Sequence, residues 1–289
     1  MSGCLVKRGG LTIREVLQEA RLIIPLAEAE YLAMGLFGLS RVELYLSERR
    51  LTPKEGRRFF SLVGKAREGM PVQYLVNSAP FLDLDIYVDR RVFIPRPETE
   101  ELVLRASARV REPKVILDYG TGSGCIAIAL ARLFPDATVF GVDASRSALQ
   151  VAKINIRRYH LENRVRLLWA NSLRSELFRA FHNRVDLLIS NPPYIPKARL
   201  ARLPLTVREY EPRIALDGGE DGIEVITMIW ECGQELLKPG GLLAVEIDSS
   251  QGEYVQERFA KAEVESDVYG RVRYLFWQKG GQDENRLGD

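Results

Sequence analysis

The sequence has few residues of the kinds that form disulfides or hold metals. Its three cysteines, Cys4, Cys125 and Cys232, are odd in number and widely spaced, and no CxxC motif occurs. This pattern favours a reduced, cytoplasmic chain. The two histidines, His160 and His182, have no neighbouring ligand at metal spacing. We therefore expect no metal site.

Long hydrophobic runs and a strong net charge are absent as well. No run approaches the roughly 20 apolar residues that span a bilayer, and the N-terminus lacks the apolar stretch of a signal peptide. We therefore expect no membrane contact. Lysine and arginine number 41 against 39 aspartates and glutamates, for a formal net charge of +2. Because the paired arginines are scattered, at 49–50, 57–58, 90–91 and 157–158, this pattern disfavours a nucleic-acid partner.

The chain does contain enough apolar residues for two domains, since 46% of its 289 residues are hydrophobic. Residues 1–73 carry three helix-start signals of the capping-box type, in which a hydroxyl and a carboxylate satisfy amides of the first turn. The pairs are Thr12 with Glu15, Ser40 with Glu43, and Thr52 with Glu55. Apolar residues at helical spacing follow each signal, which predicts a small helical bundle.

Alternation of apolar and polar residues replaces the helical spacing between residues 74 and 94. Residues 81–88 alternate, 89–90 resemble a turn, and the apolar run 92–94 follows. This pattern predicts a β-hairpin that links two domains. Residues 281–289 are polar and contain glycine, so we expect a flexible tail there.

Residues 95–280 alternate between strand-like and helix-like segments, with the first helix expected near Pro97. The expected strands are 114–118, 138–142, 165–169, 185–190 and 242–248, and the later helices lie near 124–133, 146–159, 222–237 and 250–261. Such alternation builds a parallel sheet covered on both faces, an α/β fold. The segments 263–269 and 271–278 predict an antiparallel hairpin at the edge of the sheet.

A glycine-rich turn follows the first strand of this region. It consists of Gly120, Thr121, Gly122, Ser123 and Gly124. The missing side chains let the backbone approach a ligand at a helix N-terminus, next to Asp118. Cys125 stands where a dinucleotide fingerprint has its third glycine, which disfavours a nicotinamide cofactor.

Polar residues at the ends of two later strands fit the same nucleotide-like ligand. Asp143 closes the second strand, where a carboxylate can accept hydrogen bonds from both hydroxyls of a ribose. Alternatively, Asp143 caps the helix that begins near Arg146. Asn171 and Ser172 follow the third strand, where they can meet an adenine edge or form a turn.

The sequence Asn191-Pro192-Pro193-Tyr194 directly follows the apolar strand 185–190. Each proline restricts its own φ and pushes its predecessor toward an extended conformation, so the loop is stiff. The loop can offer hydrogen-bond acceptors and an aromatic ring to a planar nitrogen group. Together with the glycine turn, it predicts methyl transfer to such a nitrogen.

Two further segments make the chain resemble the HemK/PrmC family of protein-glutamine N5-methyltransferases over nearly its whole length. They are residues 94–100, Ile-Pro-Arg-Pro-Glu-Thr-Glu, and the segment 211–222, which begins Glu-Pro and ends with Gly-Gly-Glu-Asp-Gly. The resemblance implies a class I, Rossmann-like methyltransferase domain with a small N-terminal helical domain. It implies S-adenosylmethionine as methyl donor. As acceptor it implies the glutamine of the Gly-Gly-Gln motif in class 1 peptide-chain release factors, and hence a role in translation termination.

The resemblance also implies residue roles. Residues 120–124 would contact the methionine side of the cofactor, Asp143 the ribose, and Asn171 with Ser172 the adenine. Asn191 to Tyr194 would hold the glutamine, with Asn191 close to the cofactor as well. An amide nitrogen is a weak nucleophile, so the Asn191 side-chain oxygen and the Pro192 carbonyl would accept its hydrogens while Tyr194 stacks on it. The N-terminal bundle would dock the protein substrate.

Three positions depart from the family pattern: Asn77 replaces a common Gly, Tyr119 a common Leu, and Asn171 a common acidic residue. An asparagine oxygen can still accept from the adenine amino group, so we expect altered cofactor affinity at Asn171. The alternatives are glutamine methylation of a ribosomal protein, adenine-N6 or guanine-N2 methylation of nucleic acid, and a non-catalytic binding protein. Intact Asn191 and Tyr194 disfavour the last, and we expect a monomeric enzyme.

Overall fold

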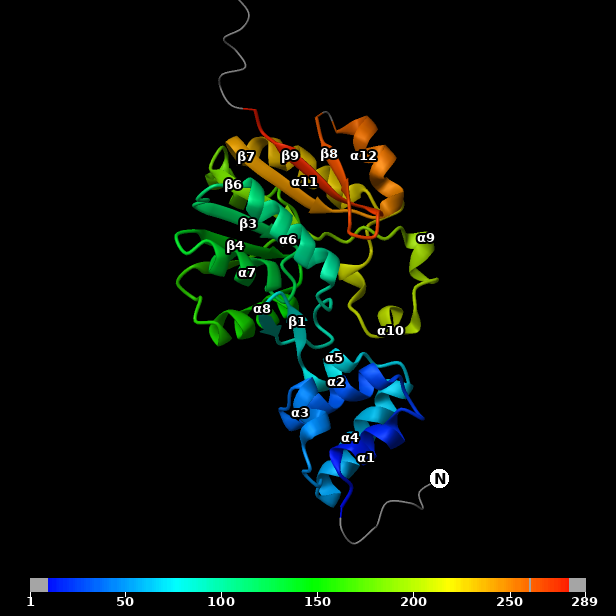
Figure 1. Ribbon diagram of the computed structural model, residues 1–289. Helices are drawn as coiled ribbons and strands as arrows, with labels where there is room; N and C mark the ends of the chain where they lie inside the picture. The colour runs from blue at the N-terminus through cyan, green and yellow to red at the C-terminus, as the bar shows by residue number, and fades with distance from the viewer. Residues whose placement is uncertain (1–9, 260, 281–289) are drawn as a thin grey trace, which may run out of the picture. The chain divides into compact units, whose positions relative to one another are not determined.

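A computed structural model describes residues 10–259 and 261–280 and divides the chain into two units (Figure 1). The first unit runs to Ser78 and also contains Pro204–Tyr210, and the second contains Ala79–Leu203 and the residues from Glu211 onward. We expected a linker at 74–94 between domains 1–73 and 95–280, whereas the structure groups the hairpin with the second unit. The expected tail, 281–289, lies outside the described residues, as does Cys4.

The first unit is helical, as its sequence predicts. Its helices are α1 (Ile13–Ala20), α2 (Leu26–Phe37), α3 (Arg41–Leu46), α4 (Pro53–Arg67), α5 (Val72–Val76) and α10 (Leu205–Arg208). The three predicted capping boxes all form, at Thr12, Ser40 and Thr52, so α1, α3 and α4 begin where the sequence indicates. The apolar faces of these helices meet in a core that includes Leu32 and Phe59.

The short helix α10 is a tertiary addition to this unit. The Tyr210 hydroxyl donates a hydrogen bond to the Glu68 carbonyl at 3.3 Å, at the C-terminal end of α4. A side chain added at Gly69 would lie 3.4 Å from Leu205. The segment 204–210 therefore packs on the turn after α4. The sequence contains no local signal for this packing, because the two segments are more than 130 positions apart.

The predicted β-hairpin exists, but its turn lies elsewhere. Strand β1 (Ala79–Phe81) pairs with β2 (Leu84–Ile86), and Phe81 faces Leu84 across a two-residue turn. The expected turn at 89–90 does form, since the Val92 amide donates to the Asp89 carbonyl at 3.1 Å, but the hairpin reverses at 82–83, and residues 72–76 form α5. Leu82 has a φ of 54°, a left-handed conformation that a leucine does not announce in sequence. The alternation of 81–88 therefore reads as one strand although the chain reverses within it.

The described part of the second unit forms a seven-stranded sheet in the order β5-β4-β3-β6-β7-β9-β8. Its strands are β3 (Val115–Tyr119), β4 (Thr138–Asp143), β5 (Val165–Trp169), β6 (Val185–Ser190), β7 (Leu237–Glu246), β8 (Glu263–Ser266) and β9 (Val272–Gln278). The pairs from β5 to β7 are parallel, and β9 runs antiparallel to both of its neighbours. The predicted parallel sheet with an antiparallel edge hairpin is thus confirmed.

Helices cover both faces of the sheet, as parallel strands require (Figure 1). One face carries α6 (Pro97–Arg109), α7 (Cys125–Leu133) and α8 (Arg146–Arg158), and the other carries α11 (Glu224–Leu236) and α12 (Gly252–Arg258). The short helices α9 (Lys197–Leu200), η1 (Glu176–Phe181), η2 (Arg213–Ala215) and η3 (Ser249–Gln251) complete the unit. Within the described ranges, no helix has the length and apolar character needed to cross a bilayer.

The strand order changes direction between β3 and β6, the central pair of the sheet. The chain moves from β3 outward to β5, then returns to the other side of β3 as β6. Connections that leave such a pair in opposite directions open a crevice at the carboxyl ends of the strands. The topology therefore directs the residues after β3, β4 and β6 to one place.

Candidate active site

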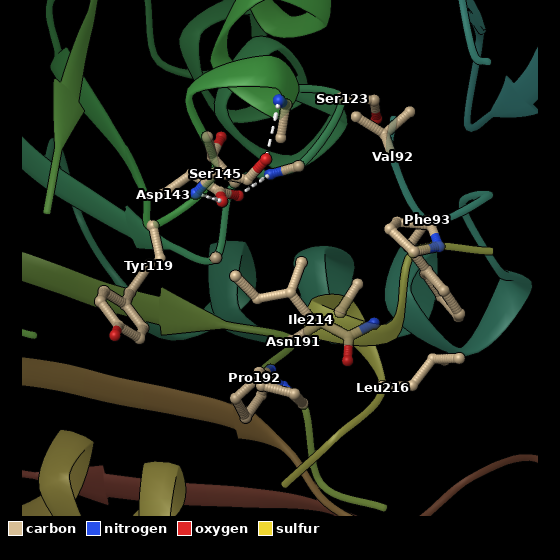
Figure 2. Close-up of a pocket in the computed structure, with 18 of the residues that line it drawn as sticks. Val92, Phe93, Tyr119, Ser123, Asp143, Ser145, Asn191, Pro192, Ile214 and Leu216 are labelled. Atoms are coloured by element: carbon tan, nitrogen blue, oxygen red, sulfur yellow. Dashed lines mark hydrogen bonds between the residues drawn. The ribbon is translucent and has the colours of Figure 1, made fainter. Parts of the chain in front are cut away.

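A pocket of about 360 Å³ opens at these carboxyl ends, in the size range of small-ligand sites (Figure 2). Its lining includes most of the residues that the sequence predicts: Gly120, Thr121, Gly122, Ser123, Asp143, Asn171, Asn191, Pro192, Pro193 and Tyr194. Two expected members, Gly124 and Ser172, do not line it. The glycine turn and the proline-rich loop, about 70 residues apart in sequence, thus share one cavity.

The glycine turn needs its glycines for backbone conformation. Gly120, Gly122 and Gly124 have φ values of 76°, 55° and 83°, where other residues are strained. Gly124 forms the N-cap of α7, and a Cβ there would lie 3.2 Å from Ala152. Gly124 therefore shapes the turn from behind the cavity.

Asp118 anchors the turn from inside the protein. Its fully buried carboxylate accepts hydrogen bonds from the Thr121 hydroxyl at 2.6 Å and the Ala127 amide at 3.2 Å. Burial raises the pKa of Asp118 to about 7. Among the described residues, nothing bonds its second oxygen, so this carboxylate keeps unused acceptor capacity beside the turn.

Asp143 ends β4 and faces the pocket. Its two oxygens accept from the amides of Gly122 at 2.9 Å and Ser145 at 2.8 Å (Figure 2). Burial raises the pKa of Asp143. The alternative role as a helix cap is wrong, because Ser145 is the N-cap of α8 and accepts from the Ala148 amide at 3.2 Å. Each carboxylate oxygen retains acceptor capacity for a ligand hydroxyl.

Of the two residues expected to contact adenine, Asn171 and Ser172, only Asn171 lines the pocket. Asn171 lines the pocket, and its carbonyl accepts from the Tyr119 hydroxyl at 3.2 Å. Ser172 instead accepts from the Arg174 amide at 3.1 Å, which stabilises the turn after β5. Tyr119, one of the departures from the family pattern, is buried against the cavity, and burial raises its pKa to about 12.

The Asn191 and Tyr194 side chains connect to two polar residues that the sequence did not single out as site residues. The Asn191 amide nitrogen donates to the Thr99 hydroxyl at 2.8 Å, and the Tyr194 hydroxyl donates to Glu246 at 3.0 Å. Thr99 donates in turn to Glu246 at 2.7 Å. Burial raises the pKa of Glu246 to about 7 and that of Tyr194 well above 10. The sequence did contain a signal for Glu246, because a glutamate is unusual within the apolar run of β7.

Apolar residues form the remaining wall of the pocket. Val92, Phe93, Ile214 and Leu216 line it (Figure 2). Ile214 and Leu216 belong to the segment 211–222 that carried the family resemblance, and Val92 and Phe93 directly precede the other such segment, 94–100. The sequence did not predict that these residues line the pocket, because their positions depend on packing between distant segments.

The residues of the cavity suit an adenosine-based sulfonium cofactor. Asp143 offers oxygens for ribose hydroxyls, the turn 120–124 brings its backbone to the cavity at the N-terminus of α7, and Tyr119 and Ile126 supply apolar surface. Among residues 10–259 and 261–280, no group of histidine, cysteine and acidic side chains could hold a metal ion.

Comparisons with known proteins agree with this geometry. Residues 99–202 match the family described as "Methyltransferase small domain", and residues 12–76 match the "PrmC N-terminal domain". A relative from Gloeobacter violaceus, named "Release factor glutamine methyltransferase", is 40% identical over 270 residues, covering 90% of this chain and 89% of its own. A relative of the same name from Moorella thermoacetica is 39% identical over 279 residues, covering 91% and 97%.

Solved structures share the fold at lower identity. A methyltransferase from Pyrococcus furiosus superimposes with a TM-score of 0.51 at 20% identity, over 79% of this chain and all of that one. The hMettl16 catalytic domain in complex with an RNA hairpin gives a TM-score of 0.51 at 13% identity, over 77% and 81%. With its α/β methyltransferase domain, its N-terminal helical domain and relatives this similar over most of its length, the chain belongs to the release factor glutamine methyltransferase family.

Proposed function

We propose that this protein transfers a methyl group from S-adenosylmethionine to the side-chain amide nitrogen of the Gly-Gly-Gln glutamine in class 1 release factors. The observation that carries the proposal is the shared pocket, in which the cofactor-binding turn and the Asn191–Tyr194 loop line one cavity. A methyl donor held by the turn and an amide held by the loop would therefore meet at short range.

On the cofactor side, Asp143 would accept from the ribose hydroxyls and the turn 120–124 would contact the methionine portion. Asn171 would carry the adenine contact, since Ser172 bonds the backbone of its own loop. When bound, S-adenosylmethionine supplies a methyl group on a sulfonium, and the bonding electron pair stays with sulfur on transfer.

On the acceptor side, the loop has to hold a nucleophile that is nearly non-basic. The amide nitrogen shares its lone pair with its carbonyl, so a new carbon–nitrogen bond needs acceptors for the amide hydrogens. The Asn191 side-chain oxygen and the Pro192 carbonyl would accept both hydrogens, and one proton passes to solvent as the product regains conjugation. The Tyr194 ring would stack on the flat amide.

Three substrate classes can be separated by one experiment. The enzyme is incubated with labelled donor and either intact release factor, ribosomal protein or DNA, and the product is mapped by tandem mass spectrometry. We expect one methyl on the glutamine of Gly-Gly-Gln. A methyl found only on adenine or guanine, or only on a ribosomal protein, would replace the release factor as the substrate.

The first unit is proposed to dock the protein substrate, because its described residues form packed helices and hold no side chains arranged for chemistry. Leu22, Val42 and Leu46 expose 82%, 66% and 70% of their surface there. Changing all three to serine should raise KM for the whole release factor about 10-fold, the scale of a few lost apolar contacts. KM for a Gly-Gly-Gln peptide and donor affinity should not change, and Leu133→Ser in the second unit is the matched control. An unchanged KM for the whole factor would remove this surface from docking.

A further inference from the structure

Three secondary-structure elements bring polar side chains together behind the catalytic loop, where they form a chain of hydrogen bonds. Asn191 follows β6, Glu246 ends β7, and Thr99 lies in the first turn of α6. β6 and β7 are parallel with Ser190 paired to Val245, so the next residues, Asn191 and Glu246, lie side by side. Thr99 connects them from the helix that covers this face, within 2.8 Å of Asn191 and 2.7 Å of Glu246.

The direction of each hydrogen bond in this chain is fixed when Glu246 is ionised. In that form its carboxylate only accepts, so the hydroxyls of Thr99 and Tyr194 both donate to Glu246. The Thr99 hydroxyl has a single hydrogen, which it donates to Glu246. It can therefore only accept from Asn191, which forces the Asn191 amide nitrogen toward Thr99 and leaves the amide oxygen for the pocket.

We propose that Thr99 and Glu246 are positioning residues that hold the Asn191 amide with its oxygen toward the substrate, and so select an acceptor that carries NH₂. This inference rests on the proposed function. Both groups are buried, with 3% and 2% of their surface exposed, so water does not compete for these bonds.

The alternative orientation of Asn191 shows what this arrangement prevents. If the Thr99 hydroxyl could donate to Asn191, the amide would rotate and present its NH₂ to the pocket. Two NH₂ groups would then face one another, and the substrate nitrogen would lose one of its two proposed acceptors. With the oxygen outward, a glutamate carboxylate is disfavoured, because two acceptors would meet.

The first test compares two changes at Thr99. Thr99→Val keeps the shape and removes the hydroxyl, and Thr99→Ser keeps the hydroxyl. We expect Thr99→Val to lower kcat about 10- to 100-fold, the scale seen when a partner that orients a functional group is removed. Donor affinity by calorimetry should stay within about twofold, and Thr99→Ser should recover most of kcat. A folded Thr99→Val enzyme with wild-type kcat would overturn the inference.

The second test asks whether Thr99 and Glu246 act through Asn191. Thr99→Val added to Asn191→Ala should cause no further loss of kcat, since the amide to be oriented is gone. Glu246→Gln added to Asn191→Ala should cost no more than Tyr194→Phe, because it also alters the bond that Tyr194 donates to Glu246. Losses that multiply in the double variants would assign both residues a separate role and overturn the inference. Because every variant is compared with wild-type methylation of the glutamine, a wild-type enzyme inactive on Gly-Gly-Gln would instead reject the proposed function.

A matched control separates positioning from general loss of stability. Asp186 is a buried carboxylate near the amino end of β6, where it accepts from the amides of Lys114 and Val115 at 2.9 and 2.8 Å. Asp186→Asn makes the same change from acid to amide as Glu246→Gln, at the opposite end of the same sheet. We expect it to leave kcat unchanged, and equal losses of kcat in both variants would contradict positioning by Glu246.

Discussion

The Arg96 guanidinium and the Glu211 carboxylate form an ion pair between residues 115 positions apart. Glu211 is almost completely buried and also accepts from the Ile94 amide at 3.4 Å. The Arg96 guanidinium in turn lies 4.8 Å from the centre of the Phe93 ring, which lines the pocket. The pair therefore joins the segments 94–100 and 211–222 next to the apolar wall of the active site.

Removing the arginine of this pair should destabilise the fold. Burial raises the pKa of Glu211, and Arg96 opposes that rise, so Arg96→Gln leaves a buried carboxylate without its counter-charge. We expect a loss of about 2 kcal/mol in the free energy of unfolding, measured by denaturant titration. Arg174→Gln breaks an exposed pair with Glu231, which solvent screens, and should cost clearly less. Equal losses of unfolding free energy in the two variants would show that the Arg96–Glu211 pair stabilises the fold no more than an exposed pair does.

Asp143→Ala should weaken S-adenosylmethionine binding by about 2–3 kcal/mol, the scale of losing charge-assisted hydrogen bonds. The change removes the proposed ribose acceptor and also the oxygens that hold the Gly122 and Ser145 amides. Isothermal titration calorimetry measures the effect, with Asp136→Ala as an exposed carboxylate control. Unchanged affinity in a folded Asp143→Ala protein would exclude Asp143 from the site.

Asn191→Ala should slow the chemical step about 10²- to 10³-fold, because it deletes one preorganised acceptor of the amide hydrogens. Donor affinity should remain nearly unchanged. Single-turnover rates with saturating donor and release factor measure the step directly. A variant with the wild-type single-turnover rate would refute the acceptor role.

The two changes at Tyr194 should differ strongly. Tyr194→Phe keeps the ring and loses the bond to Glu246, so we expect a mild loss of kcat, whereas Tyr194→Ala removes the stacking surface and should be severe. The hydroxyl donates to a carboxylate and its pKa is raised well above 10, which argues against its acting as a base. Steady-state kinetics of both variants decide the matter, since a base at this position would make Phe nearly as damaging as Ala.

The stability of the protein should depend on the protonation of Glu246. Its pKa is raised from 4.5 to about 7 by burial, although Thr99 and Tyr194 donate to it and Arg273 opposes the rise, while Glu98 adds to it. The folded state therefore binds more protons than the unfolded state between these values. The stability from this group is fully present below about pH 4.5 and is lost as pH rises through about 7.

This dependence can be measured against Glu246→Gln, which cannot titrate. From about pH 6 to pH 8, the free energy of unfolding of the wild type should fall by about 1 kcal/mol relative to the variant. The difference cancels the other groups that titrate in this range, including Asp118. Denaturant unfolding at several pH values gives the result, and a difference that stays constant with pH would contradict the raised pKa.

Local signals in the sequence predicted much of the fold. The capping boxes at Thr12, Ser40 and Thr52 work through atoms three residues apart, so the sequence contains the whole interaction. The strand and helix alternation of residues 95–280 likewise predicted the sheet and its edge hairpin. The glycine turn needs positive φ values that only its own residues decide. These features depend on short-range geometry and are readable without a structure.

The sequence by itself therefore determined the capped helices, the strands of the sheet, the glycine turn and the Asn191–Tyr194 loop. Only the tertiary structure decided which distant residues support them: Thr99 bonds Asn191 across 92 positions, and Glu246 bonds Thr99 across 147. It also assigned Pro204–Tyr210 to the first unit and left Ser172 outside the pocket lining. Such contacts follow from strand order and register, which bring residues together whatever their separation along the chain.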